Sequence, residues 1–411
     1  MYFTFHYNFN LILCCLMPWS LRMVLYASII VCLILLYFGF RYFRSVNKAG
    51  LKSSRLFKIL FLLAATLFLA YPAAGLIEYF ISSSFTRTGY PNTIIYLFWY
   101  GVVYTGVMVN WLLLHDILKP VWSWISKHPK KEIDRTFAQI FLILTCLTAI
   151  YTAVKIVWET NRIAIEEIHY TLPNPDNPFE PLTIVHIADL HADPYTRNPH
   201  MNRYVEIVNR FEPDIVVFAG DLITSGTDHI DAGAAALGQI ESVYGFFAVL
   251  GDHDYWTETE WVIQSLQENG VPVLQNENAW IDHKGSLIKL TGITELYSTQ
   301  VQADTLASLL NENRGADLKL LVSHQASDRL IEESQNAGVH QLLGGHTHGG
   351  QIRIPVFFYP FTAARAETRY INGHWMIGDM LLNINNGLGF TLAPVRYNAP
   401  AQVSVIRVNT E

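Results

Sequence analysis

The chain has 411 residues, of which 51% are hydrophobic and only 15% are charged, and its net charge is −7. So large an apolar share over this length excludes an ordinary soluble globular protein. Residues 182–411 hold 26 acidic and 13 basic residues, which argues against a nucleic-acid partner because phosphate backbones attract basic surfaces.

Long apolar stretches fill the first 160 residues. Each exceeds the roughly 20 residues that a spanning helix needs, so we predict a multi-pass transmembrane region over residues 1–160 with about four spans. The stretches are 23–43, 56–81, 93–118 and 136–158. Pro72 and Gly75 are expected to kink the second span. Residues 1–22 are more polar, and we expect an interfacial segment there or an over-long start with Met23 as the alternative first residue.

Four polar residues stand out in these stretches: Glu78, Asn110, His115 and Asp116. Such residues line a polar pathway in some membrane proteins. We favour the alternative, that they lie at the membrane interface or hold helices together.

The loops between the stretches differ in positive charge. The first and third loops are rich in Lys and Arg, whereas the second carries only Arg87. Positive loops stay in the cytoplasm, so we predict a cell-membrane protein whose C-terminal domain faces the extracytoplasmic side.

A proline-rich segment separates the two halves of the chain. Four prolines fall within residues 172–181, so we predict a stiff linker over 161–181 and a domain over 182–411. Helical stretches at 201–211, 258–269, 305–313 and 328–337 alternate with apolar strands, which favours an α/β domain. The four cysteines all precede this domain, so a metal site in it must use His and carboxylate ligands.

Polar clusters follow five apolar, β-rich runs in this domain, at 183–188, 214–219, 245–250, 318–323 and 339–343. Open α/β sheets bind ligands at the carboxyl ends of their strands, so we expect the clusters to form one site. Their members are Asp189 and His191, then Asp221, then Asp252, His253 and Asp254, then His324, and finally His346 and His348. The last pair lies in the glycine-rich stretch G-G-H-T-H-G-G-Q.

This order of motifs resembles the calcineurin-like metallophosphoesterases: D-x-H, G-D, G-D-H-D, a lone His and G-H-T-H. The wording G-H-T-H-G-G-Q-I-R-I-P at 345–355 is similar to the YkuE-type branch. The resemblance implies a two-sheet α/β sandwich flanked by helices and a pair of divalent ions, Mn, Fe, Zn or Mg. It implies that the first ion is held by Asp189, His191 and His348, that Asp221 bridges, and that the second is held by Asp252, His324 and His346.

The resemblance also implies hydrolysis of a phosphate mono- or diester by a metal-activated hydroxide. His253 is then expected to protonate the leaving group and Asp254 to orient its ring. A lipid-linked phosphate is one candidate substrate. Two alternatives stay open: a lipid-sugar pyrophosphatase resembling UDP-diacylglucosamine hydrolase, against which the outward topology counts, and a non-catalytic scaffold with a degenerate site.

The chain departs from the family at Asp252, where asparagine is usual. Aspartate still offers an oxygen ligand, but it makes the site less positive by one charge. We therefore predict weaker attraction for an anionic substrate and a different preferred metal. Gln325-Ala326 replaces a frequent proline, which concerns loop shape. We expect His186 to be a core histidine, and Arg396 to form a structural ion pair rather than to contact phosphate.

Overall fold

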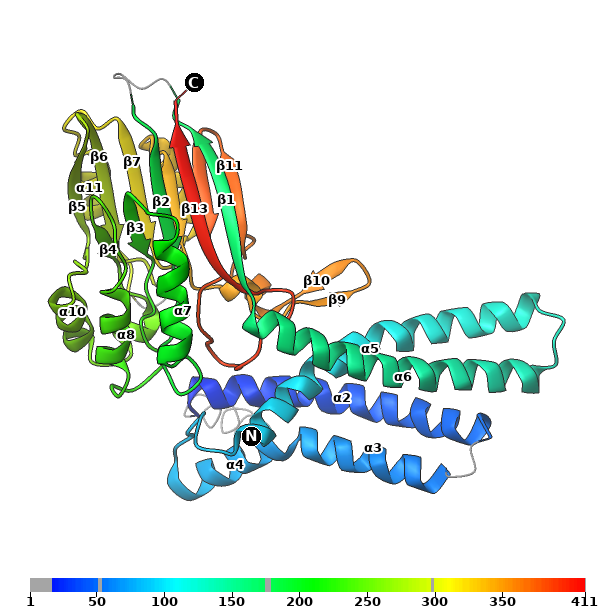
Figure 1. Cartoon of the computed structure of the whole chain (residues 1–411). Helices are drawn as coiled ribbons and strands as arrows, with labels where there is room; N and C mark the ends of the chain where they lie inside the picture. Colours follow the sequence, from blue (N-terminus) through cyan, green and yellow to red (C-terminus); the bar gives the residue numbers. More distant parts are fainter. Residues whose placement is uncertain (1–16, 51–53, 174–178, 297–298, 411) are drawn as a thin grey trace, which may run out of the picture. The chain divides into compact units, whose positions relative to one another are not determined.

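The computed structural model describes residues 17–50, 54–173, 179–296 and 299–410, and it divides into two compact units (Figure 1). The helical unit comprises Met1–Trp158 and Ile352–Phe361, and the sheet unit comprises Glu159–Gln351 and Thr362–Glu411. The expected domain over 182–411 is thus interrupted by ten residues that cluster with the helices. Cys14, Cys15, most of residues 1–22 and the centre of the proline-rich segment lie outside the described residues.

The helical unit contains long apolar helices at the four predicted positions. In the described part of the chain, three are long and apolar enough to cross a membrane: α2 (Trp19–Lys48), α5 (Asn92–Ile125) and α6 (Lys130–Asn161). A fourth span results if α3 (Ser54–Phe68) and α4 (Ala70–Ser82), bent by 41° at their junction, act as one. The break at Leu69 falls just ahead of Pro72, whose ring clashes with the carbonyl group four residues earlier.

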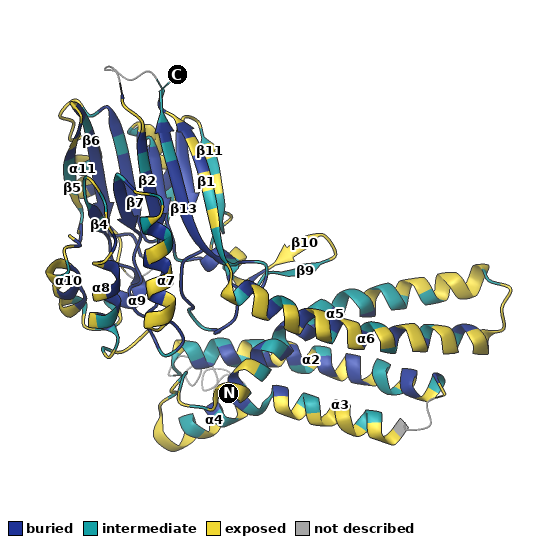
Figure 2. Cartoon of the chain, in the orientation of Figure 1, coloured by how far each residue is buried: buried dark blue, intermediate teal, exposed yellow. Residues whose placement is uncertain are grey.

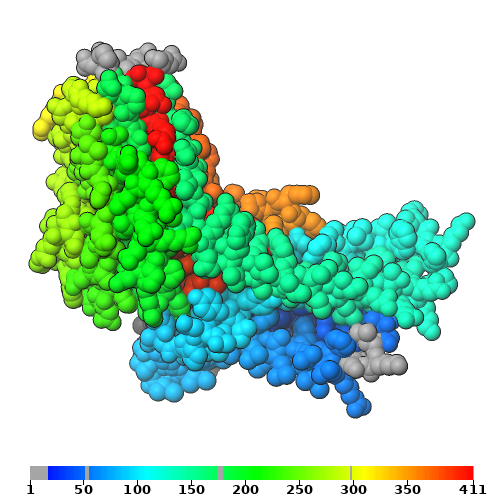
Figure 3. All heavy atoms as spheres, in the orientation of Figure 1, coloured from blue at the N-terminus to red at the C-terminus, as the bar shows by residue number. Residues whose placement is uncertain are grey.

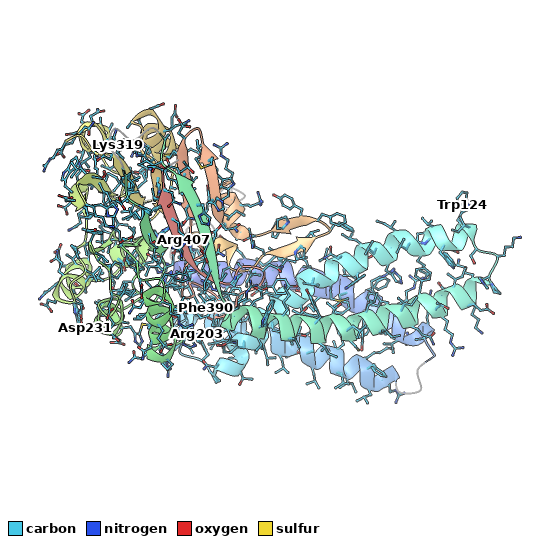
Figure 4. The ribbon with its side chains drawn as sticks, turned by 45° about the horizontal axis from the view of Figure 1, so that its top comes forward. Trp124, Arg203, Asp231, Lys319, Phe390 and Arg407 are labelled. Atoms are coloured by element: carbon cyan, nitrogen blue, oxygen red, sulfur yellow. The ribbon has the colours of Figure 1, made fainter. Side chains whose placement is uncertain are left out.

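Apolar side chains fill the interior of this unit and also cover its surface. Aromatic side chains of α2, α5 and α6 meet in its core, among them Phe38, Tyr104 and Phe141, while leucines and isoleucines also cover its outside (Figure 2). Trp124, 86% exposed, projects at the end of α5 (Figure 4). Asp116 pairs with Arg41 of α2 at 2.5 Å, so this polar residue links two helices, as the favoured alternative expects.

The sheet unit is a two-sheet sandwich, as the family resemblance implies. One sheet has the order β1-β13-β2-β3-β4 and the other β11-β12-β8-β7-β6-β5. The strands of the first are β1 (Ile163–Thr171), β13 (Ala401–Asn409), β2 (Leu182–Ile187), β3 (Ile215–Phe218) and β4 (Phe246–Ala248). Those of the second are β11 (Gly373–Ile377), β12 (Met380–Ile384), β8 (Gln341–Gly344), β7 (Leu318–Ser323), β6 (Ser286–Ile293) and β5 (Glu277–His283).

The core of the sandwich lies between the facing sheets, where Ile184 and Ile406 of the first meet Leu290 and Leu320 of the second. Helices cover the outer faces. The first sheet packs against α7 (Asn198–Asn209), α8 (Ile230–Leu237) and α10 (Thr259–Glu268). The second packs against α11 (Ala303–Asn311) and α12 (Asp328–Asn336). Four of these five helices match the predicted helical stretches.

Strand β1 departs from the sequence-based expectation. Its residues fall in the predicted linker, yet they pair in parallel with the C-terminal strand from Ile163↔Ala401 to Thr171↔Asn409. Figure 3 shows β13, in red, beside the green strands that flank it. Alternating burial along β1 provides the apolar face that this pairing needs. Residues 163–171 therefore belong to the sheet and are not part of a linker.

Candidate metal centre

The structure brings all seven predicted ligands together at the carboxyl ends of the central strands. Both sheets contribute, since the ligands follow β2, β3 and β4 in one and β7 and β8 in the other. The strands within each of these two sets run parallel, so their ends meet at one edge. The groups able to hold a cation include Asp189 with His191 and His348, and Asp252 with His324 and His346.

The first of these groups is entirely buried. His191 Nε2 lies 2.9 Å from His348 Nε2, and His348 Nε2 lies 3.3 Å from Asp189 Oδ1. Two imidazole nitrogens at this distance cannot both carry a proton, so at least one presents a lone pair. A pair of imidazoles with one carboxylate is a donor set that suits a divalent cation.

The second group repeats this arrangement, and Asp221 joins the two. Asp252 Oδ1 lies 3.0 Å from His324 Nε2 and 3.3 Å from His346 Nδ1. Asp221 Oδ2 lies 3.4 Å from His191 Nε2 of the first group and 3.3 Å from His324 Nε2 of the second. One carboxylate oxygen within reach of both groups is the geometry that a bridging ligand requires.

The backbone at the site is unusual. Five of the seven ligands adopt a left-handed conformation, with φ between 47° and 69°: Asp189, His191, Asp221, His346 and His348. This conformation is uncommon for residues other than glycine and is concentrated at functional sites. Gly251 allows its own backbone to lie against the Asp221 carboxylate, because a Cβ atom at position 251 would be only 2.0 Å from Asp221 Oδ1.

The buried charges shift one another's pKa. Burial raises the pKa of Asp189 to about 7. Burial would also raise the pKa of Asp252, but hydrogen bonds to His324 and His346 lower it overall. Burial would lower the pKa of His346, but its hydrogen bonds to Asp252 and Glu367 raise it to about 9. Protons on His324 and His346 therefore compensate the carboxylates, and bound cations would take over that role.

His253 lies over the first group. Its backbone N–H donates to Asp221 Oδ1 at 3.0 Å, and its ring centroid is 4.7 Å from those of His191 and Trp256. Its Nδ1 lies 2.6 Å from the carbonyl oxygen of Thr224. A carbonyl group only accepts, so Nδ1 carries the proton of this bond and Nε2 is left for other partners.

The expected pairing of Asp254 with the His253 ring is wrong. The Asp254 carboxylate accepts backbone N–H groups of Asp221, Leu222 and Gly251, each at 2.9 Å. Asp254 is the third residue of the short helix α9 (Asp252–Tyr255), and its carboxylate turns back to the N–H of Gly251 at the helix start and to the loop after β3. Thr224 orients the His253 ring, and a contact made by a backbone carbonyl leaves no side-chain signal in a sequence.

The second group borders a cavity of about 240 Å³. Its lining includes His346 and three acidic residues, Glu295, Asp328 and Glu367. Glu367 Oε2 lies 3.3 Å from His346 Nε2, a contact that sequence analysis missed because the loop around Glu367 carries no motif. This lining suits a neutral, hydroxyl-bearing group or a cationic one.

His186 has the core position that the sequence predicts, whereas Arg396 is structural through backbone carbonyl groups and not through the expected ion pair. Arg396 is fully buried and donates to carbonyl groups on the loops behind the site, among them those of Gly387 and Gly389 at 3.1 and 2.6 Å. The Gly389 N–H in turn donates to the carbonyl oxygen of Asp189. His186 is held in the core by Asn383 at 2.6 Å, and burial lowers its pKa to about 4.

Residues 182–350 match the family described as calcineurin-like phosphoesterase. The chain is 27% identical over 232 residues to an uncharacterized metallophosphoesterase of Helicobacter pylori (strain J99), which covers 55% of this chain and 60% of that protein. It is 26% identical over 252 residues to the uncharacterized metallophosphoesterase YkuE of Bacillus subtilis, covering 60% of this chain and 86% of YkuE. It is also 26% identical over 275 residues to a transmembrane protein with metallophosphoesterase domain of Danio rerio, covering 64% of this chain and 61% of that protein.

Proposed function

We propose that this protein is a membrane-anchored phosphoesterase that works with two divalent cations, because residues 182–350 match the calcineurin-like phosphoesterase family. The observation that carries the proposal is the pair of buried ligand groups joined by Asp221. The apolar helices supply the anchor. The match spans about three fifths of the Helicobacter relative's length, so the proposal rests on this chain's own site.

The residues present fit two cations. Asp189, His191 and His348 would hold one, Asp252, His324 and His346 the other, and Asp221 would bridge. Mixed imidazole and carboxylate ligands suit Mn, Fe, Zn or Mg. When bound, such a pair neutralises charge on phosphoryl oxygens and acidifies a water molecule.

His253 is the proton donor in this proposal. Its Nδ1–H is engaged by the Thr224 carbonyl, so Nε2 is the nitrogen that can deliver a proton to the leaving oxygen. Packing between His191 and Trp256 limits the ring's movement. Asp254 acts indirectly, since it fastens the Gly251 loop to the backbone of Asp221.

The cavity beside His346 would receive the alcohol portion of the ester. Its carboxylates are paired with Arg329, Arg369 and His346, so they offer hydrogen-bond acceptors that favour a small hydroxylated or amine-bearing group. Polar lipid headgroups have this chemistry, and a membrane anchor would keep the site near them. The excess of Lys and Arg in the first and third loops supports an extracytoplasmic location for the sheet unit, where nucleotide-linked glycolipids are not expected.

The test uses full-length protein in detergent with Mn²⁺. We expect close to two metal ions per chain and hydrolysis of bis-p-nitrophenyl or p-nitrophenyl phosphate, both lost in Asp221→Asn. The matched control is Asp228→Asn, an exposed carboxylate in the loop that follows Asp221. A chain that binds no metal and turns over neither ester would instead favour the scaffold alternative.

A further inference from the structure

Residues 352–361 form an aromatic hairpin, with β9 (Ile354–Val356) paired to β10 (Tyr359–Phe361). Val356 pairs with Tyr359, so the turn consists of Phe357 and Phe358 alone. All four aromatic residues between 357 and 361 are exposed, and Phe358 is 103% exposed. In a water-soluble protein, so dense an exposed aromatic cluster would be an aggregation liability.

The hairpin packs on helix α5, and these contacts group it with the helical unit. Asn110 Nδ2 donates to the carbonyl oxygen of Pro355 at 2.7 Å, and Asn110 Oδ1 accepts the N–H of Phe357 at 2.5 Å. One turn earlier on the helix, Gly106 leaves room for Ile354, because a Cβ atom on Gly106 would lie 2.5 Å from Ile354 Cδ1. The docking site thus lies near the middle of α5.

Asn110 is one of the polar residues that the sequence leaves unexplained in an apolar span. Non-helical backbone at membrane depth needs protein groups to satisfy its hydrogen bonds, since lipid tails offer none. The Asn110 amide does this for one N–H and one C=O group at the hairpin's turn. If the hairpin enters the membrane, its backbone N–H and C=O groups need hydrogen-bond partners from the protein. An asparagine in the middle of the span provides such partners.

The turn itself is strained. Phe357 has a φ of 55°, at the first position of a two-residue turn, where glycine is strongly favoured. A bulky side chain in this conformation persists only where its surroundings or its function hold it. Phe357 is therefore present at the tip although glycine would adopt this backbone conformation at a lower energetic cost.

We propose that the aromatic hairpin inserts its tip into the lipid bilayer beside α5. Lipid is the occupant because the docking face of α5 continues into lipid-facing residues. Gly106 and Asn110 share one helical face with Leu113 and Ile117, and these two side chains are exposed on a helix apolar enough to span a membrane. Phenylalanine and tyrosine are suited to the boundary between headgroups and acyl chains.

The chain connects this hairpin directly to the metal centre. His348 precedes Ile352 by only four residues, and the Thr362 hydroxyl donates to the Gly350 carbonyl oxygen at 2.9 Å, which closes the base of the excursion. A lipid-held hairpin would therefore restrain the loop that carries a metal ligand. The inference rests on the proposed membrane anchoring and is independent of hydrolysis.

The test is quenching of a fluorescent label by lipids that carry a nitroxide on the acyl chain. Phe358→Cys is made in full-length protein whose four native cysteines are replaced by serine, labelled with bimane, and reconstituted in vesicles. Two matched sites, both exposed valines, serve as controls: Val154→Cys on α6, 64% exposed, and Val243→Cys in the sheet unit, 68% exposed.

We expect the label at 358 to lose as much fluorescence as the label at 154, while the label at 243 keeps its fluorescence. A label at 358 that behaves like the one at 243 overturns the inference, whether water or another protein covers it. If the label at 154 is also unquenched, the membrane anchoring itself fails. Metal binding and ester hydrolysis are measured separately, so the two failures are distinguishable.

Discussion

The two units of this chain differ in the charged groups that one buries and in the apolar surface that the other exposes. The sheet unit encloses aspartates and histidines at the ends of its strands, with Asp189 and His324 fully buried. The helical unit exposes leucine and isoleucine, and one asparagine on α5 accommodates the polar backbone of a hairpin. Buried charge in one unit needs cations or protons as partners, whereas exposed apolar surface in the other needs lipid. The ten residues 352–361 follow His348 closely in the chain but cluster with the helical unit.

The largest expected effect comes from the shared carboxylate of the metal centre. Asp221→Asn should lower kcat/KM by more than the roughly 10–100-fold typical of residues that merely support a metal ligand, because one oxygen of Asp221 serves both groups. Steady-state kinetics and metal analysis measure this. Full activity with two bound metals would show that the two groups do not form one centre.

His253→Gln should reduce turnover of an alkyl phosphodiester by about 10²-fold or more, as expected for loss of a general acid. The loss should be much smaller with a p-nitrophenyl leaving group, which departs without a proton. The ratio between the two substrates is the measurement. An equal loss on both would assign His253 a role in binding or metal ligation instead, since it also lies near His191 and Asp221.

Gly251→Ala tests the close packing around the buried charges. The added Cβ atom would overlap Asp221 Oδ1, so we expect a destabilisation of about 1–3 kcal/mol together with loss of bound metal. Gly270→Ala is the control, because Gly270 has open space around its Cβ position, and an alanine there would be strained only by the positive φ of 81°. Both variants should show a lower Tm in detergent, and only Gly251→Ala should lose metal.

On the membrane side, Asn110→Leu removes two hydrogen bonds that hold the hairpin to α5. Each is worth about 1 kcal/mol net, so the label at position 358 should be quenched less by acyl-chain nitroxides. Thr105→Val is the control, since the Thr105 hydroxyl bonds within α5 to the Gly101 carbonyl group. Equal quenching in both variants would mean that Asn110 does not position the hairpin.

The smallest expected effect is that of Asp252→Asn. An amide oxygen can replace Asp252 Oδ1 beside His324 and His346, and removal of one negative charge should favour an anionic substrate. We expect kcat/KM to stay the same or to rise by less than about tenfold. A clear decrease would show that the second ion depends on the full carboxylate charge.

Sequence patterns predicted most of the fold that positions the site. Each ligand group follows an apolar run, and the strands and four of the helices around the site lie within a few residues of their expected places. The periodicity of short segments did not predict strands whose pairing partner is far away in the sequence. Strand β1 looked like part of a linker because its partner, β13, is at the other end of the chain.

The sequence by itself determined which side chains are available for metal ligation and which stretches can cross a membrane, because both depend on residue type and short spacing. Only the tertiary structure decided that the Thr224 carbonyl orients His253 and that Asn110 holds a hairpin that begins four residues after His348. These contacts join residues that are distant in the chain or use backbone atoms. Contacts of either kind leave no periodic pattern in the sequence, so they become visible only in the folded structure.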